Sequence, residues 1–381
     1  MGKIHFLVVA TEWTSAHGGL STFNRQLCTH LAMTGALVSC IVLEVSDDDR
    51  RDAAAKGVTL VEAARTPGAS SAERLSRKPD LGEAGTPDVI IGHARITGPA
   101  AHRLSDDFPQ AKRLHFIHMI PDEIERHKLN QGQDVGKLAE ERHQVELELS
   151  ADANYAVAVG PRIHSWFLRD LQARGVDTSK VLRFDPGFDA GPNESRNPPA
   201  GAPWMVLLFG RAEDDRLKGL DLAALGFSAT ARRRSAYLPQ IELVIRGAQE
   251  GTSLALERQM VEWAKNEALN VRVKPYVAQS DRLISDLRAA SLVLMPSRAE
   301  GFGLVAAEAI IARTPVLVSS TSGLGELLRE VLPPHEAIRN VVETTGDDAM
   351  TADEWSRAIE AMLRDRDGAF TWAEQLQNRL A

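Results

Sequence analysis

The sequence predicts an α/β fold class, with two doubly wound domains that face each other across a cleft. Apolar segments of strand length alternate with segments of helical period along the chain, which favours parallel sheets covered by helices. At 381 residues the chain is long enough for two hydrophobic cores. Residues 189–203 concentrate Pro, Gly, Asn and Ser without an apolar period, so we expect them to link the two halves.

The first half of the chain carries a series of short apolar segments that we expect to be strands. Segments with helical patterns separate most of them. This half, residues 1–188, is therefore expected to form one domain. The predicted strands are Ile4–Ala10, Val38–Glu44, Val58–Glu62, Val89–Gly92, Arg113–His118, Tyr155–Val159 and Val181–Phe184.

The second half repeats the alternation, and residues 204–365 are expected to form a second domain. Two helical patterns close the chain, one from about Asp353 to Arg364 and one over Phe370–Leu380. The predicted strands of this half are Met205–Phe209, Ile241–Ile245, Val271–Tyr276, Leu292–Met295 and Val316–Ser319.

The segment SLVLMPSRAEGFGLVAAEAIIARTPVLV carries two carboxylates at positions that suggest a binding site. Glu300 and Glu308 are separated by seven residues, and a Gly-Phe-Gly turn lies between them. This turn joins an apolar strand to an apolar helix. Glu300 is therefore expected in the loop at the carboxyl end of a strand, which is where open α/β sheets bind ligands. Gly301 and Gly303 let the backbone approach such a ligand closely.

The helix that begins near Gly303 offers free N–H groups and a partial positive charge to an anion. Glu308 falls about one turn into this helix, and its carboxylate is expected to point back toward the same crevice because helical side chains tilt toward the N-terminus. Both carboxylates can accept hydrogen bonds from the hydroxyls of a sugar or a ribose. Either glutamate alone is more often a solvated residue, but the turn between them favours a binding site.

The longer segment SRAEGFGLVAAEAIIARTPVLVSSTSGLGELL resembles the E-x7-E signature of the retaining family 4 glycosyltransferases. The match includes Pro296-Ser297, the turn, the second glutamate and Thr314-Pro315-Val316. Arg313 departs from it, because these enzymes usually carry Gly before Thr-Pro. The resemblance implies the GT-B fold, in which two doubly wound Rossmann-like domains face each other across a cleft.

That fold implies a role for each part of the chain. Residues 1–188 would form the acceptor-side domain, and residues 204–365 would form the domain that binds the nucleotide sugar. The C-terminal helix, residues 366–381, would pack back on the first domain.

The resemblance also implies roles for residues around the turn. Glu300 would contact the donor sugar, and Glu308 would bind the ribose. The backbone of Phe302, Gly303 and Leu304 would complete the donor-sugar site.

Sugar transfer needs basic groups, because breaking the anomeric C–O bond leaves negative charge on phosphate oxygens. The segment FGRAEDDRLKGLD resembles the family's basic loop, with Arg211 and Lys218-Gly219 in the expected order and Asp221 after them. The spacing is two residues longer here than usual, so Arg216 is an alternative for one of the two basic positions. A solvated role is the favoured interpretation for Arg216.

Two residues of the first half are candidates as well. Gly19 lies in the segment HGGLSTFNRQL, between a strand and an amphipathic helix, and resembles the Gly-Gly loop of the same family. His118 ends a predicted strand, and a histidine at the corresponding place in this family faces the donor sugar. His115 would point to the other side of the strand, because an odd number of positions separates it from His118. A purely structural role stays open for both candidates.

Composition narrows the class of partner and the compartment. With 44 basic and 52 acidic residues the net charge is −8, which does not favour nucleic acid as a partner. Only Cys28 and Cys40 occur, so neither a disulfide framework nor a cysteine zinc site is supported. Ile4–Ala10 is too short to span a membrane, and no secretory cleavage pattern follows it. We expect a cytoplasmic protein with at most peripheral membrane contact.

Other acidic groups are better explained without catalysis. Asp47-Asp48-Asp49 contains the D-x-D pattern that holds a metal in GT-A glycosyltransferases, but it is expected to be a helix start with acids near the positive end of the dipole. No acid is placed by a motif to activate water, as a hydrolase would need. A charge-rich helical stretch is expected to be a solvated face, and its residues are Glu140, Glu141, Arg142, Glu146 and Glu148.

The resemblance thus implies a retaining, metal-independent glycosyltransferase that uses a nucleoside diphosphate sugar. UDP-glucose is the family's default donor, and the acceptor would be a hydroxyl of a saccharide, a lipid or a small molecule. No cofactor is expected, because the donor is a co-substrate. Two alternatives stay open: a non-catalytic GT-B module that binds a nucleotide sugar, and a GT-B sugar-nucleotide epimerase. A nicotinamide dehydrogenase is disfavoured, because no G-x-G-x-x-G follows the first strand.

Overall fold

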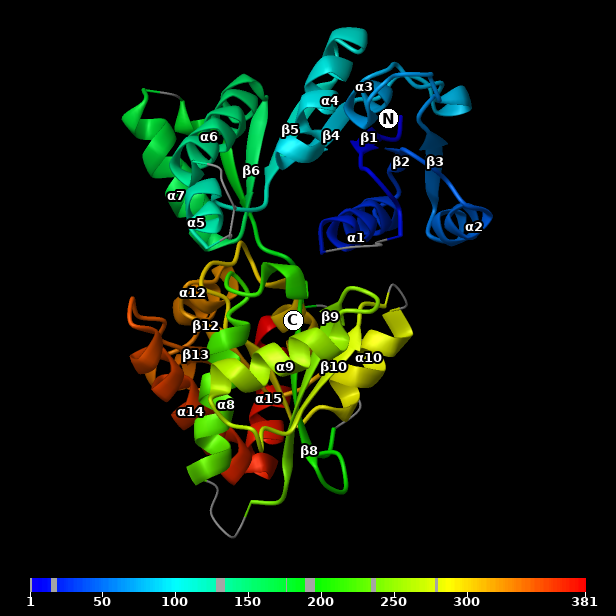
Figure 1. Ribbon diagram of the computed structural model, residues 1–381. Coiled ribbons are helices and arrows are strands. Elements are labelled where there is room, and N and C mark those ends of the chain that lie inside the picture. Colours follow the sequence, from blue (N-terminus) through cyan, green and yellow to red (C-terminus); the bar gives the residue numbers. More distant parts are fainter. Residues whose placement is uncertain are drawn as a thin grey trace. The chain divides into compact units, whose positions relative to one another are not determined.

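The computed structural model describes residues 2–14, 19–127, 134–175, 177–188, 196–233, 238–277 and 280–381. These residues form two compact units (Figure 1). The first comprises the chain to Glu125 and from residue 134 to Phe184, and the second comprises the chain from Asp185 to Ala381. Each unit is built around one parallel sheet with helices beside it (Figure 1).

The first unit contains a parallel sheet that has seven strands within the described residues, in the order β3-β2-β1-β4-β5-β6-β7. The order changes direction between β1 and β4, as in a doubly wound fold. The strands are β1 His5–Val9, β2 Leu37–Val42, β3 Val58–Glu62, β4 Val89–His93, β5 Lys112–Ile117, β6 Tyr155–Val159 and β7 Val181–Phe184. The helices are α1 Gly19–Met33, α2 Asp47–Ala55, α3 Ser71–Leu75, α4 Ala94–Asp107, α5 Pro121–Glu125, α6 Val135–Asp152 and α7 Pro161–Ala173, with 3-10 turns at Gly82–Ala84 and Thr178–Lys180.

The second unit contains a parallel sheet with six strands in the described residues, in the order β10-β9-β8-β11-β12-β13. Here the order changes direction between β8 and β11. The strands are β8 Trp204–Phe209, β9 Ile241–Ala248, β10 Val271–Pro275, β11 Leu292–Met295, β12 Val316–Ser319 and β13 Val341–Val342. The helices are α8 Leu220–Arg233, α9 Ser253–Ala264, α10 Ser280–Ala289, α11 Leu304–Ile311, α12 Gly323–Val331, α13 Pro334–Ala337, α14 Asp348–Arg364 and α15 Arg366–Leu380, with a 3-10 turn at Ala212–Asp214.

The core of the second unit is continuous from its central strands to α14. Val206 of β8 and Leu292 of β11 belong to one buried cluster with Trp355 of α14. Helix α14 packs along α8 at Gly226, where a Cβ atom would lie 3.0 Å from the Cβ of Trp355. The absence of a side chain at Gly226 therefore allows the close approach of the two helices.

The strands expected from the sequence are present, which confirms the doubly wound α/β class. Their ends lie within two residues of the expected ones, except that β9 continues to Ala248. Strand β13 was not predicted, because Val341–Val342 is too short to show an alternating pattern.

The C-terminal helix belongs to the second unit, where α15 contacts α11 and α14. Its expected packing on the first domain stays a prediction. Its Trp372 is 3% exposed, and the indole Nε1–H donates to Asn340 Oδ1 at 2.7 Å. The apolar face of α15 is thus buried against its own unit.

The expected linker, residues 189–203, is only partly described, since residues 189–195 lie outside the described part of the chain. Arg196 is anchored to the second unit. Its guanidinium donates to Leu287 O at 2.9 Å and to Ala312 O at 2.8 Å. The described remainder of this segment therefore begins on the second unit.

Candidate functional site

The candidate site of the second unit lies where the strand order changes direction. Strands β8 and β11 are direct neighbours, with Leu207 paired to Val293. The loops that follow them therefore leave the sheet at the same edge, on either side of the switch point, which is where open α/β sheets bind ligands. The β8 loop carries Arg211 and Lys218, and the β11 loop carries Glu300.

The two loops meet in an ion pair between predicted site residues. Lys218 Nζ donates to Glu300 Oε2 at 2.6 Å, and the two side chains are 23% and 19% exposed. The hydroxyl of Ser297 donates to the same oxygen at 3.2 Å. Both side chains are thus mostly buried, but each keeps some exposed surface through which a ligand can contact it.

Backbone contacts hold the two loops against each other. The backbone N–H of Arg298 donates to Leu217 O at 2.9 Å, directly beside Lys218. The next residue, Gly219, has a φ of 67° and lies against Pro296, whose carbonyl oxygen a Cβ atom would overlap. Glycine is required there for both reasons, since it tolerates a positive φ and allows the close approach. The Lys218–Glu300 pair depends on this approach.

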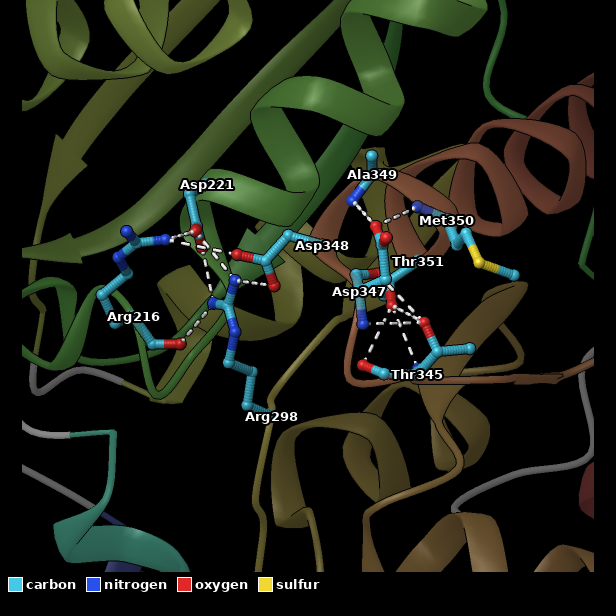
Figure 2. A network of polar contacts seen from close by, with 9 residues as sticks. All are labelled: Arg216, Asp221, Arg298, Thr345, Asp347, Asp348, Ala349, Met350 and Thr351. Atoms are coloured by element: carbon cyan, nitrogen blue, oxygen red, sulfur yellow. Dashed lines mark hydrogen bonds and ion pairs between the residues drawn. The ribbon is translucent and has the colours of Figure 1, made fainter.

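Figure 2 shows the side chain that ties the two loops to a third element. Arg298, 10% exposed, donates to both carboxylate oxygens of Asp221, at 2.7 and 2.9 Å, and to Asp348 Oδ1 at 2.7 Å. Burial opposes ionisation of Asp221, but the hydrogen bonds and charges of Arg298 and Arg216 hold the pKa of this carboxyl below its ordinary value. The sequence reasoning missed Arg298, although its place between Ser297 and Glu300 is the signal that could have found it.

The other two arginines of the β8 loop have different surroundings. Arg216 pairs with Asp221 and lies 3.6 Å from Asp348, so it belongs to the Arg298 network. Arg211 is 54% exposed, and its Nη2 lies 3.5 Å from Asp214 Oδ2. Within the described residues, no contact joins Arg211 to Lys218 or Glu300. Its role at a diphosphate stays a prediction.

The Gly-Phe-Gly turn is held by the start of the next helix. Gly323 N–H donates to Gly301 O at 3.0 Å, and Leu324 N–H donates to Phe302 O at 2.7 Å. Gly303 has a φ of 102° and caps α11, whose first residue is Leu304. The turn thus presents the N-terminal N–H groups of α11 beside Glu300, because the first N–H groups of a helix have no acceptor within it.

Glu308 lies on α11, one turn after its start, as the sequence predicted. Its side chain is partly buried. Within the described residues, the carboxylate makes no hydrogen bond or ion pair. Burial raises the pKa of Glu308 to about 7, because desolvation disfavours the charged form. A carboxylate in this state is stabilised by any ligand that donates hydrogen bonds to it.

The candidates of the first unit lie at the corresponding edge of its sheet. Gly19 is the first residue of α1 and is exposed, while the neighbouring residues 15–18 lie outside the described part. His118 follows β5 and packs edge-on against Phe23 of α1, with ring centroids 4.9 Å apart. Its Nε2 lies 3.0 Å from His93 Nδ1. Burial and the neighbouring His93 hold the pKa of His118 well below its usual value.

Two of the expectations about charged groups have definite outcomes. His115 bonds Glu146 Oε2 of α6 at 3.0 Å, so it faces away from His118, as predicted. Glu146 is 1% exposed and also accepts from Arg95 N–H at 2.6 Å. The prediction of a solvated face is wrong for Glu146, because its carboxylate is buried against His115 of β5.

The D-x-D pattern lies at a helix start, as predicted. Ser46 caps α2, and its hydroxyl accepts from Asp49 N–H at 3.1 Å while the Asp49 carboxylate accepts from Ser46 N–H at 3.2 Å. Asp48 pairs with Arg51 on the same helix. Among the described residues, no group of three or more histidine, cysteine or acidic side chains could hold a metal ion. No helix there has the length and apolar character needed to cross a membrane.

Comparison with known sequences identifies the family. The sequence pattern described as "Family 4 Glycosyltransferase in conflict systems" matches residues 7–381. The chain belongs to this family. A D-inositol 3-phosphate glycosyltransferase of Mycobacterium tuberculosis is 28% identical over 203 residues, which are 51% of this chain. The match covers 38% of that relative's length, so the chain corresponds to well under half of it.

Solved structures show which fold this family 4 chain has. Sucrose-phosphate synthase from Thermosynechococcus elongatus superposes with a TM-score of 0.69 at 18% identity, covering 99% of this chain and 94% of the other. HepE from Anabaena, solved with UDP and glucose, gives a TM-score of 0.65 at 15% identity over 98% and 94% of the two chains. The fold is GT-B, with two Rossmann-like domains, which confirms the expected fold class.

Proposed function

We propose that this protein is a retaining glycosyltransferase that moves a sugar from a nucleoside diphosphate donor to an acceptor hydroxyl without a metal. UDP-glucose is the first donor to test. The observation that carries the proposal is the Lys218–Glu300 pair, 2.6 Å apart at the switch point of the second sheet and next to the N-terminus of α11. It combines an ammonium for a diphosphate with a carboxylate for sugar hydroxyls.

Each group of the site has a part in binding the donor. Lys218 and the first N–H groups of α11 offer positive charge where phosphate oxygens gain negative charge. Glu300 accepts hydrogen bonds from hydroxyls of the sugar, held in place by Ser297. Glu308, which has no partner of its own among the described residues, accepts from the ribose hydroxyls. Arg211 adds a second cation if it leaves Asp214 for the diphosphate.

The bond changes need no base from the protein. The anomeric C–O bond to the diphosphate breaks, and its electron pair goes to the phosphate oxygen. The acceptor oxygen forms the new bond on the same face of the sugar, and its proton passes to that phosphate oxygen. Retention of configuration follows from attack on the leaving group's face, and the family resemblance supports it.

The comparisons support a nucleotide-sugar donor without naming it. The mycobacterial relative is described as a glycosyltransferase, and Anabaena HepE was also solved with UDP-glucose. Both lie below 30% identity to this chain, so the sugar, the base and the acceptor are open to test.

The test combines donor binding with product formation. A panel of nucleoside diphosphate sugars is screened by thermal shift, since a ligand that binds only the folded state raises the melting temperature. The best donor is then incubated with hydroxyl acceptors, with and without EDTA, and the anomeric configuration of the product is read by NMR.

We expect a glycoside of retained configuration whose yield does not change in EDTA. Strict dependence on Mn²⁺ or Mg²⁺, or an inverted product, would contradict the proposal. Donor binding without product on any acceptor would instead favour the binding module, and interconversion of the free donor would favour an epimerase.

A further inference from the structure

Three polar side chains form a hydrogen-bonded chain at the ligand edge of the first sheet. His93, the last residue of β4, lies between Asn24 of α1 and His118 after β5. His93 Nε2 is 3.0 Å from Asn24 Oδ1, and His93 Nδ1 is 3.0 Å from His118 Nε2. Asn24 and His93 are each 1% exposed, whereas His118 is partly exposed. The chain therefore runs from the interior to an accessible ring.

Only one arrangement of protons satisfies this chain when both rings are neutral. An amide oxygen can only accept, so His93 Nε2 must carry a hydrogen. A neutral imidazole has one N–H, so His93 Nδ1 is then an acceptor, and His118 Nε2 must donate to it. His118 Nδ1 is left with a lone pair, and within the described residues it has no hydrogen-bond partner.

Two cysteines also contact the Asn24 amide. Its Nδ2 donates to Cys40 Sγ at 3.5 Å, and Cys28 Sγ donates to Oδ1 at 3.9 Å. Both sulfurs are buried. These contacts are compatible with the orientation in the structure, in which the amide oxygen faces His93.

The packing also keeps the rings neutral and in place. Phe23 contacts His118 edge-on, and Phe116 stacks on it with centroids 6.3 Å apart. Desolvation, with a smaller effect from His115, lowers the pKa of His93 to about 3. His93 and His115 are the titratable groups that act on His118. At neutral pH the proton arrangement is thus set by hydrogen bonding and not by charge.

We propose that Asn24 and His93 are positioning residues that hold His118 in its Nε2–H tautomer, so that His118 Nδ1 accepts a hydrogen bond from a ligand hydroxyl. In this tautomer, His118 Nδ1 distinguishes ligand groups that donate a hydrogen bond from groups that only accept one. It favours a neutral hydroxyl and offers nothing to a phosphate oxygen, which needs a donor. The identity of the ligand rests on the proposed function. The tautomer of His118 is a property of the protein alone and can be measured without turnover.

The experiment measures the tautomer directly. The full chain is labelled with ¹⁵N-histidine, and two-bond nitrogen–proton NMR spectra are recorded at pH 7.5, with His118→Ala identifying the His118 signals. In the unsubstituted protein we expect His118 Nδ1 to resonate as an unprotonated nitrogen and Nε2 as a protonated one.

Two matched pairs of variants test the chain of hydrogen bonds. Asn24→Gln keeps a neutral amide oxygen that can accept from His93 Nε2–H, and His93→Asn keeps an acceptor near the position of Nδ1, so both should keep the His118 tautomer. Asn24→Leu and His93→Leu remove these acceptors and should give averaged or reversed nitrogen shifts. Near-UV circular dichroism shows whether each variant is folded, and Asn24→Ala or His93→Ala, which also lack the acceptor, replaces a leucine variant that is not.

An Nδ1–H tautomer of His118 in the unsubstituted protein would overturn the proposal, and so would His118 shifts that stay unchanged in both folded leucine variants. Where turnover is measurable, His93→Leu should lower kcat/KM about tenfold, the worth of roughly one hydrogen bond, and His93→Asn should restore most of it. A protein that shows the tautomer but no turnover would leave this inference standing and remove the proposed function.

Discussion

The two sheets place loops at equivalent edges but fill them with opposite chemistry. In the second unit the edge is ionic, with Lys218 on Glu300 and Arg298 on Asp221. In the first unit the edge is a cluster of aromatic and imidazole rings that includes Phe23 and is kept neutral by burial. One topology thus carries two kinds of chemistry, a charged edge that the proposed function assigns to a diphosphate and a neutral edge that it assigns to hydroxyls.

The difference follows from how each unit meets the cost of burying charge. The second unit keeps its charges by pairing them, so Asp221 stays ionised beside two guanidinium groups. At the edge of the first unit His93 is uncharged instead, because a buried imidazole can release its proton. Substitutions that remove charge should therefore have much larger effects at the edge of the second sheet than at the edge of the first.

The largest effect is expected at the ion pair of the second unit. Lys218→Ala and Glu300→Gln should each lower kcat/KM by about 10²–10³, because an electrostatic contact to the charged transition state is lost. His118→Gln at the neutral edge should cost only about tenfold. Product formation at subsaturating donor gives the ratios.

The matched control is Glu354→Gln, which changes a carboxylate in an exposed ion pair with Arg357 on α14 and should leave the rate unchanged. Wild-type turnover in both the Lys218 and Glu300 variants would contradict the assignment of the site. A loss of kcat/KM in His118→Gln as large as in these two variants would contradict the contrast between the edges.

The next effect is on stability. Arg298→Met should lower the free energy of unfolding by about 3 kcal/mol, because it leaves the 4%-exposed carboxylate of Asp221 with only the half-exposed Arg216. Asp348→Asn removes a partner that is 51% exposed and should cost less than about 1 kcal/mol. Urea denaturation of both variants measures the two values. Similar losses in the two would show that burial does not set the worth of this network.

A third prediction concerns pH, because burial raises the pKa of Glu308 to about 7 and lowers the pKa of His93 to about 3. The folded state holds a proton on Glu308 up to a pKa of about 7, against an ordinary value of 4.5, so folding stability from this group falls as pH rises through that window. Glu308→Gln should therefore be no more stable than wild type at pH 4.5. Above pH 7 it should be more stable by on the order of 1–3 kcal/mol.

His93 acts in the opposite direction, because its pKa falls from 6.5 to about 3 and its cost appears as pH drops below 6.5. The difference in unfolding free energy between Glu308→Gln and wild type, measured by denaturation from pH 4.5 to 8.5, isolates the glutamate, since the His93 contribution is common to both. A flat difference would show that Glu308 is solvated.

The smallest effect is expected at Arg313, where the family usually has glycine. Arg313 has a φ of 53° and its guanidinium donates to Gln377 Oε1 of α15 at 3.2 and 3.3 Å. Arg313→Gly and Arg313→Ala both lose this contact, but only glycine relieves the left-handed backbone. The free energy of unfolding of the glycine variant should exceed that of the alanine variant by about 1 kcal/mol, as measured by thermal or urea unfolding. Equal stabilities would mean that the backbone there relaxes.

Local pattern was enough to predict the sheets and much of the second edge. Alternation and helical period mark the strands because they depend on neighbours a few residues apart, and strand ends locate the edge where Glu300 lies. The place of Glu308 one turn into α11 follows from helical geometry alone. The resemblance to family 4 rested on this same stretch and predicted the fold that the comparisons show.

The tertiary structure alone decided which groups touch. Lys218 and Glu300 are 82 positions apart, Asn24 and His93 are 69 apart, and His115 and Glu146 are 31 apart. No periodic pattern links residues at such separations, because their contact depends on how loops and helices pack across a sheet. The same reason applies to Arg298, to the buried Glu146 and to α15, whose place on the second unit follows from its contacts and not from its amphipathic pattern. The sequence by itself determined the elements and the edges, and the packing of distant segments determined the chemistry at each edge.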